Sequence, residues 1–290
     1  MRSNPRRAQS IIAALLLAGG LSANAVDELR PTFASEVAVP EERTILPLLK
    51  VVCGEGVRTG IREGRKTFGC GDGSMDEILA SRHRPRRYPW IPGVLWEADG
   101  VLFGHFLSPT SDDAAINCFA CESHPNLWGG TLLLTRNAGK WEPVWYKAGV
   151  ITRHCRRVSL VTGRQILFCE ETDGGMGHSI HGLYTVDFKT PRFAWRNVVL
   201  MADSYSCLML GGVQIQSIDR ISFDEMEHGE LLVRVYARHG RVRLRPDYAW
   251  DPLPTPKVLR CEIDFRLDGD SFRVMPETAP AARLFGVHTE

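Results

Sequence analysis

Histidines and acidic residues recur in the polar segments that separate the apolar runs of this sequence. Imidazole is a common metal ligand and can act as an acid or base near neutral pH. If these segments meet at one end of a rigid scaffold, their side chains form a binding face; scattered surface histidines are the alternative. No metal ion or cofactor is assigned. The residues of this candidate face are His124, His154, His178, His181, His239, Asp173 and Asp203.

Cys118-Phe119-Ala120-Cys121 is a Cys-x-x-Cys pair, which can chelate zinc, exchange thiols or form structural disulfides. Zinc sites of this kind usually contain a second such pair, and the redox motif opens a helix after a strand. Haem attachment requires His directly after the second cysteine, where this sequence has Glu122. Structural disulfides are therefore the preferred interpretation, with metal binding and redox chemistry left open.

The segment from Cys155 to Glu171 predicts a disulfide from its turn geometry. Two apolar runs flank Thr162-Gly163, and Gly supplies the left-handed position of a short hairpin loop. A loop centred on Thr162 places Cys155 opposite Cys169, at about the 4.5–5.5 Å Cβ separation of directly opposed residues. Two further pairs, Cys53–Cys70 and Cys207–Cys261, are predicted on weaker grounds, the second mostly by elimination.

No recognised nucleophile motif occurs in the sequence. The acidic pairs Asp112-Asp113, Glu170-Glu171 and Asp224-Glu225 could serve a glycosidase, but adjacent residues point to opposite faces of a strand, so solvated turns are expected. The Gly-rich segment from Asp173 to Gly177 opens no evident helix that would hold a phosphate, and a flexible loop is expected.

Residues 1–25 have the pattern of a secretory signal peptide. Three arginines precede a short apolar run, and Ala23-Asn24-Ala25 fits a cleavage site. Cleavage changes the formal net charge from +1 to −2, so no strong attraction to nucleic acid or anionic lipid is expected. No other stretch is apolar enough to span a membrane. Eight cysteines also suit a secreted or periplasmic protein.

The mature chain is predicted to start with an extended arm, residues 26–43, followed by a single domain, residues 44–290. Within that domain Leu48–Cys53 is interpreted as a strand. Three similar units follow near residues 101–146, 155–200 and 213–274, each with four apolar runs separated by turn residues. In each unit a turn followed by an aromatic residue precedes the last run, at Trp141, Trp195 and Phe272.

Repeated four-stranded meanders at this spacing favour an all-β fold of β-propeller-like antiparallel blades, with a decorated β-sandwich as the alternative. Segments such as Leu160–Phe168 and Phe223–Val233 resemble secreted β-propellers of the FG-GAP or VCBS-like kind. The resemblance implies an acidic turn that often binds calcium. Because Thr162-Gly163-Arg164 lacks the carboxylates, calcium is not expected here.

The sequence thus predicts an exported, disulfide-stabilised binding or interaction module, whose partner is an unidentified extracellular protein or glycan. The alternative is an extracellular hydrolase or metal-dependent enzyme that uses the His-bearing loop face. Convergence of His124, His178 and His239 would favour the enzyme, and splayed loops would favour the binding module.

Overall fold

The computed structural model describes residues 32–62, 64–70, 96–119, 129–175, 178–189, 196–205, 213–225, 231–242 and 259–287. The chain divides into Met1–Pro31 and Thr32–Glu290, and only the second unit contains described residues. The predicted signal peptide, residues 1–25, and residues 26–31 of the predicted arm therefore lie outside the described part.

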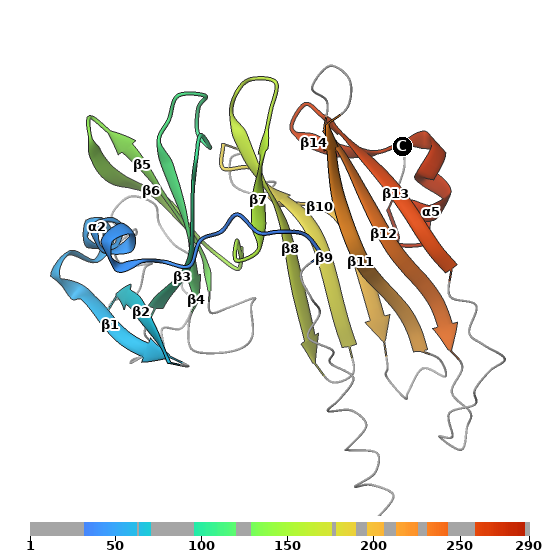
Figure 1. The fold of residues 1–290 in the computed structure, drawn as a ribbon, viewed down its shortest axis with the longest axis horizontal. Coiled ribbons are helices and arrows are strands. Elements are labelled where there is room, and N and C mark those ends of the chain that lie inside the picture. Colours follow the sequence, from blue (N-terminus) through green and yellow to red (C-terminus); the bar gives the residue numbers. More distant parts are fainter. Residues whose placement is uncertain are drawn as a thin grey trace, which may run out of the picture. The chain divides into compact units, whose positions relative to one another are not determined.

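The first sheet, sheet A, is an antiparallel meander of six strands in chain order (Figure 1). A helix, α2 (Glu42–Cys53), and a single 3-10 turn, η1 (Gly54–Gly56), precede it. Its strands are β1 (Val57–Arg62), β2 (Arg65–Cys70), β3 (Trp96–Gly104), β4 (Asp113–Phe119), β5 (Gly130–Asn137) and β6 (Lys140–Ala148).

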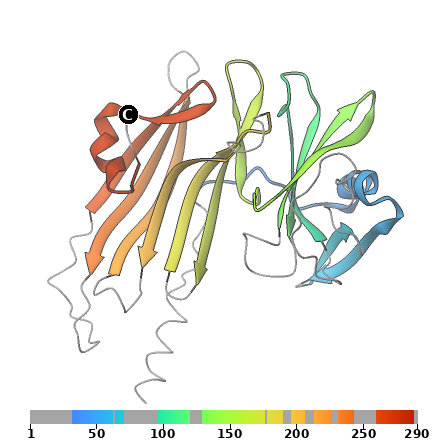
Figure 2. The same ribbon diagram turned by 180° about the vertical axis from the view of Figure 1, so that it is seen from behind.

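The second sheet, sheet B, is an antiparallel meander of eight strands and is followed by a 3-10 turn, η3 (Pro276–Thr278), and a short helix, α5 (Ala279–Arg283). Figure 2 shows the same strand order from behind. Its strands are β7 (Cys155–Ser159), β8 (Gln165–Gly175), β9 (His178–Val186), β10 (Arg196–Tyr205), β11 (Val213–Glu225), β12 (Leu231–Val242), β13 (Leu259–Asp268) and β14 (Ser271–Val274).

The all-β class predicted from the sequence is confirmed, and the twelve apolar runs of the three units overlap in order with β3 to β14. Four-stranded blades are not confirmed. The β10–β11 pair, through Tyr205 and Gln214, joins the second and third units into one sheet. Sheet B also curves into a half-barrel, since the Phe272 ring of β14 lies 5.4 Å from the Phe168 ring of β8.

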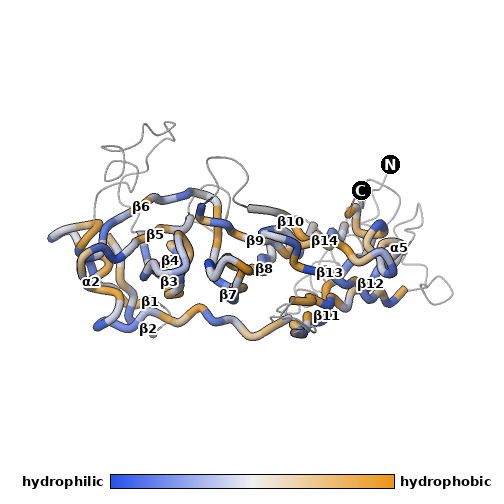
Figure 3. The backbone as a smooth tube through the Cα atoms, turned by 90° about the horizontal axis from the view of Figure 1, so that it is seen from above, coloured by the Kyte–Doolittle hydropathy of each residue, from blue (hydrophilic) through white to orange (hydrophobic). Residues whose placement is uncertain are grey.

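The inner face of sheet B is apolar because the inward-pointing residues of its strands are mostly apolar, and in β12 and β13 they alternate with accessible outward-pointing residues. In β13, Cys261, Ile263 and Phe265 point inward and are buried, while the residues between them are accessible. Figure 3 shows hydrophobic and hydrophilic residues interspersed in the part of the chain that carries β11 to β14. Ala282 and Phe285, from α5 and the residues after it, complete this core.

Sheet A is covered on both faces. Ile45, Leu48, Leu49 and Val52 of α2 pack against one face, in a core that includes residues of β3, β4 and β5. The predicted strand at Leu48–Cys53 is therefore wrong, because the spacing of these four residues gives the apolar stripe of a helix. A third core joins the other face of sheet A to β8 and β9 of sheet B, for example through Leu133 and Tyr184.

An extended segment, Thr32–Ala38, hereafter the N-terminal arm, contacts both sheets. The Ile221 amide of β11 donates to the Thr32 carbonyl (3.2 Å), and the Glu36 amide donates to the Cys155 carbonyl (2.8 Å). Ala38 forms an isolated antiparallel bridge with Val101 of β3. The arm therefore ties sheet A to the edge strand β7 and to the interior strand β11 of sheet B.

Two of the predicted disulfides are confirmed, Cys155–Cys169 and Cys53–Cys70. Cys155 and Cys169 are directly opposed in the β7–β8 register, as the turn at Thr162-Gly163 predicts. Gly163 has a φ of 79°, the left-handed conformation that glycine adopts at little cost. The second disulfide joins the end of α2 to the end of β2.

Candidate functional site

His154, Glu170 and His181 form a buried cluster on the inner side of sheet B, hereafter the His–Glu cluster. Glu170 lies on β8 and His181 on β9, and their side chains are only 5% and 3% exposed. His181 Nε2 lies 2.5 Å from Glu170 Oε1, and His154 Nε2 lies 3.3 Å from Glu170 Oε2. The neighbouring disulfide, Cys155–Cys169, holds His154 and Glu170 side by side across β7 and β8.

The His–Glu cluster anchors the N-terminal arm. The Thr32 amide donates to both Glu170 oxygens, at 3.1 and 3.3 Å. His154 Nε2 also lies 2.9 Å from the Phe33 carbonyl, and the two rings pack 4.7 Å apart. A buried carboxylate needs such compensation, because charge is costly to remove from water without hydrogen bonds. His154 and His181 therefore help to hold the N-terminal arm on sheet B, His154 by direct contact and His181 through Glu170.

His239 and Asp203 meet a different polar group, the buried Gln216 of β11. Gln216 Nε2 lies 3.2 Å from His239 Nδ1 and donates to the Leu284 carbonyl at 2.9 Å. Gln216 Oε1 accepts from the Asp203 amide at 2.8 Å. The Gln216 side chain thus joins three strands to the segment that follows α5.

The other candidates are placed by the backbone or lie outside the described part. Asp173 of β8 is opposite Ile180, and His178 of β9 is opposite Gly175 and Tyr205. His124 lies outside the described residues. Strand direction places the described candidates toward one end of sheet B, yet His154 and His181 contact Glu170 whereas Asp203 and His239 contact Gln216. No group of three or more metal-ligating side chains is placed to hold an ion within the described ranges.

Several expectations about polar residues are wrong. Glu170 and Glu171 belong to β8 rather than to a solvated turn, and the Glu170 side chain is buried. Asp113 is also buried: its carboxylate accepts the Phe106 and Leu107 amides, the Ser111 hydroxyl and the Thr135 hydroxyl. Residues 173–175, expected in a flexible loop, end strand β8.

Cys118 and Cys261 carry free thiols, so the predicted Cys207–Cys261 disulfide and a disulfide at Cys118 are wrong; Cys121 and Cys207 themselves lie outside the described residues. Burial raises the pKa of the Cys118 thiol well above its ordinary value, and the nearby Asp99 charge adds to the effect. Burial also raises the pKa of Cys261. Such thiols are poor nucleophiles.

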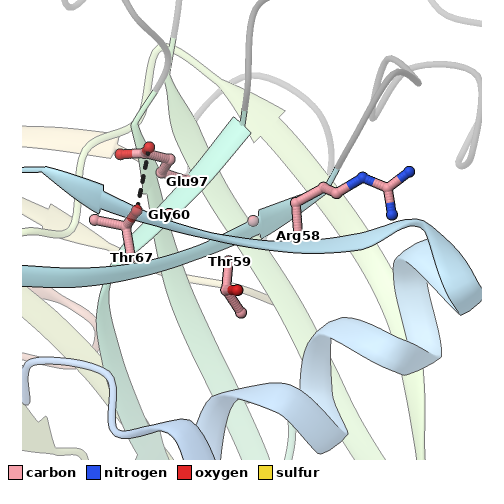
Figure 4. Close-up of a pocket in the computed structure, with 6 residues that line it drawn as sticks. Arg58, Thr59, Gly60, Thr67 and Glu97 are labelled. Atoms are coloured by element: carbon pink, nitrogen blue, oxygen red, sulfur yellow. Dashed lines mark hydrogen bonds between the residues drawn. The ribbon is translucent and has the colours of Figure 1, made fainter.

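A shallow hollow lies between β1, β2 and β3 (Figure 4). Its walls include Thr59, Gly60 and Gly69, and the Thr67 hydroxyl donates to Glu97 at 3.4 Å, while Arg58 points away from that pair. The hollow has a volume of about 10 Å³, which is about the room that one water molecule needs. It is too small to enclose a substrate.

The outer face of β11, β12 and β13 carries an ordered set of arginines around one tyrosine, hereafter the arginine face. Sequence reasoning missed it, although the alternation Arg234-x-Tyr236-x-Arg238 marks one accessible strand face. The members are Arg220 of β11, Arg234, Tyr236 and Arg238 of β12, and Arg260 of β13.

Cross-strand contacts fix most of these side chains. The Arg234 guanidinium forms two hydrogen bonds with Asp264 (2.8 and 3.0 Å) and contacts Glu262 (3.0 Å). The hydrogen bond to Asp264 raises the pKa of Arg234 further above its ordinary value. Arg238 Nε donates to Asp219 at 2.8 Å.

Arg220 is fixed by an aromatic ring instead of an acid. Its guanidinium carbon lies 4.2 Å from the centre of the Tyr236 ring, within the range of a cation–π contact. Tyr236 is its direct partner in the β11–β12 register. The arginine face therefore presents oriented guanidinium groups on a rigid sheet.

No protein-family model, no curated protein and no solved structure matches this chain. Among the described residues, none of the helices has the length and apolar character needed to cross a membrane.

Proposed function

We propose that the chain is an exported, disulfide-stabilised binding module that contacts its partner through the arginine face. The observation that carries this proposal is the set of accessible Arg and Tyr side chains held in place by contacts such as the Arg220–Tyr236 stack. Arg and Tyr are enriched at binding surfaces. Side chains that are already ordered lose less conformational entropy on binding.

The two disulfides support export, because disulfides persist in oxidising compartments and are rare in the cytosol. The signal-peptide pattern of residues 1–25 points to the same compartment. Binding through one face of sheet B does not require the four-stranded blades of a β-propeller, which stay a prediction from the sequence.

The enzyme alternative depends on histidines that converge on a common point. His154 and His181 are engaged by Glu170, and His239 by Gln216. His124 and the side chain of His178 lie outside the described part, so a catalytic role for them stays a prediction. No contact among the described residues favours the enzyme over the binding module.

The proposal is tested by retention of the purified protein on a panel of immobilised neutral and acidic polysaccharides and acidic and basic polypeptides. Saturable retention that is lost in the double variant Arg220→Ser/Tyr236→Ser, but kept in Arg43→Ser, supports binding through the arginine face. Arg43 is a suitable control because it is an exposed arginine of α2 with 85% of its side chain accessible. Retention unaffected by the double variant contradicts the proposal, and release of shortened polymer favours the enzyme.

A further inference from the structure

Two members of the arginine face, Arg220 and Arg260, have no acidic partner among the described residues. Arg234 and Arg238 are neutralised by Asp264 and Asp219 at 2.8 Å. Arg220 instead stacks on Tyr236, and Arg260 is exposed without an ion pair or hydrogen bond to any described group. Their guanidinium groups remain available to an anion from outside.

Arg260 also stands in an unfavourable position for stability. It is the direct cross-strand partner of Arg238, and like charges placed opposite each other destabilise a sheet, an effect that the ion pair of Arg238 with Asp219 offsets in part. A residue that lowers stability at an exposed position is a common feature of binding sites, where function and stability compete. The Arg238–Arg260 pair is therefore better explained by an external anion than by the fold.

The two free arginines are well separated on a fixed frame. Arg220 shares a cross-strand row with Tyr236, and Arg260 shares the next row on this face with Arg238. From regular strand spacing their Cα atoms lie about 12 Å apart, since two strands and two residues along the strand separate them. A chain with repeated charges can contact both guanidinium groups at the same time.

The composition of the arginine face indicates which class of polymer binds there. Protein interfaces usually contain a buried apolar centre. Of the large apolar side chains that are exposed in the described part, only Leu259 belongs to β11, β12 or β13, and it shares the inner face with Cys261, two residues along the strand, rather than the arginine face. A planar guanidinium forms paired hydrogen bonds with a carboxylate. A hydrophilic polymer that carries carboxylate groups is therefore a suitable ligand for this face.

We propose that Arg220 and Arg260 bind carboxylates of an acidic polysaccharide, an assignment that rests on the proposed binding function. The test is equilibrium binding of polygalacturonate, neutral dextran and poly-glutamate at low and high salt. Arg220→Ser and Arg260→Ser are compared with Arg43→Ser, which removes the same charge from α2. We expect wild type to bind polygalacturonate in preference to the other two probes, each face variant to bind about fivefold more weakly, and salt to weaken binding.

The thermal unfolding midpoint of the variants supplies a readout that is independent of the binding measurement. Arg260→Ser should weaken binding without lowering the thermal unfolding midpoint, because it removes the like-charge pair with Arg238. Equal binding of dextran overturns the assignment to carboxylates, and preference for poly-glutamate overturns the assignment to a polysaccharide, while binding as such remains. Failure of wild type to bind any probe overturns both this inference and binding of such polymers through the arginine face. Unchanged binding by both variants overturns the assignment to these two residues.

Discussion

Replacing Glu170 with Gln tests whether the His–Glu cluster holds the N-terminal arm. The carboxylate is in contact with three groups: the Thr32 amide, His154 Nε2 and His181 Nε2. Gln replaces one of the two carboxylate oxygens with an NH2 group that cannot accept, and its remaining oxygen is uncharged, so we expect about two charge-assisted contacts to be lost. At roughly 1.5 kcal/mol each, the free energy of unfolding should fall by about 3 kcal/mol.

Urea unfolding measures this loss, and hydrogen exchange at the amides of Glu36 and Ala38 reports on the arm. Faster exchange at both amides is expected, because Glu170 no longer fixes Thr32. Glu142→Gln is the matched control, since Glu142 is an exposed residue of β6. A Glu170→Gln variant within 0.5 kcal/mol of wild type, roughly the range of ordinary surface substitutions, with unchanged exchange in the arm would refute this role.

Three further outcomes are expected. Cys155→Ala/Cys169→Ala should lower the free energy of unfolding by about 3 kcal/mol, because the closed loop has a sequence separation of 14; an unchanged urea midpoint would contradict this. Thr185→Val should stabilise by about 1 kcal/mol, since the buried Thr185 hydroxyl has no partner among the described groups, whereas Thr135→Val should destabilise because Thr135 donates to a buried carboxylate; equal effects in thermal melts would exclude this reasoning. Cys118 should resist alkylation at pH 8 until the protein unfolds, because burial raises the pKa of its thiol; mass spectrometry that finds Cys118 modified in the native protein would disprove it.

The strands and one disulfide could be predicted because their signals are local. The turn at Thr162-Gly163 fixes which residues of β7 and β8 are opposed, and that register places Cys155 beside Cys169. The order of the strands in the two sheets could not be predicted in the same way. Whether two meanders share a sheet depends on a short junction between β10 and β11 around Tyr205 and Gln214, which leaves no periodic signal in the sequence.

The candidate site was predicted in part. His154 and His181 do lie together, but the carboxylate between them was interpreted as a solvated acid. Burial of Glu170 depends on donors from residues more than a hundred positions away, such as Thr32, and on the arm that supplies them. The strand alternation that makes Arg234, Tyr236 and Arg238 neighbours was present in the sequence. Their partners on β11 and β13 became evident only with the register.

The central claim is that this chain is a binding module whose contact surface is the arginine face. The most direct measurement is a titration of polygalacturonate into the double variant Arg220→Ser/Arg260→Ser and into the control Arg43→Ser/Arg65→Ser, whose net charge is the same. We predict that the control retains wild-type affinity while the face variant loses most of it, with both proteins equally folded by circular dichroism. Equal affinity of the two double variants would contradict the claim.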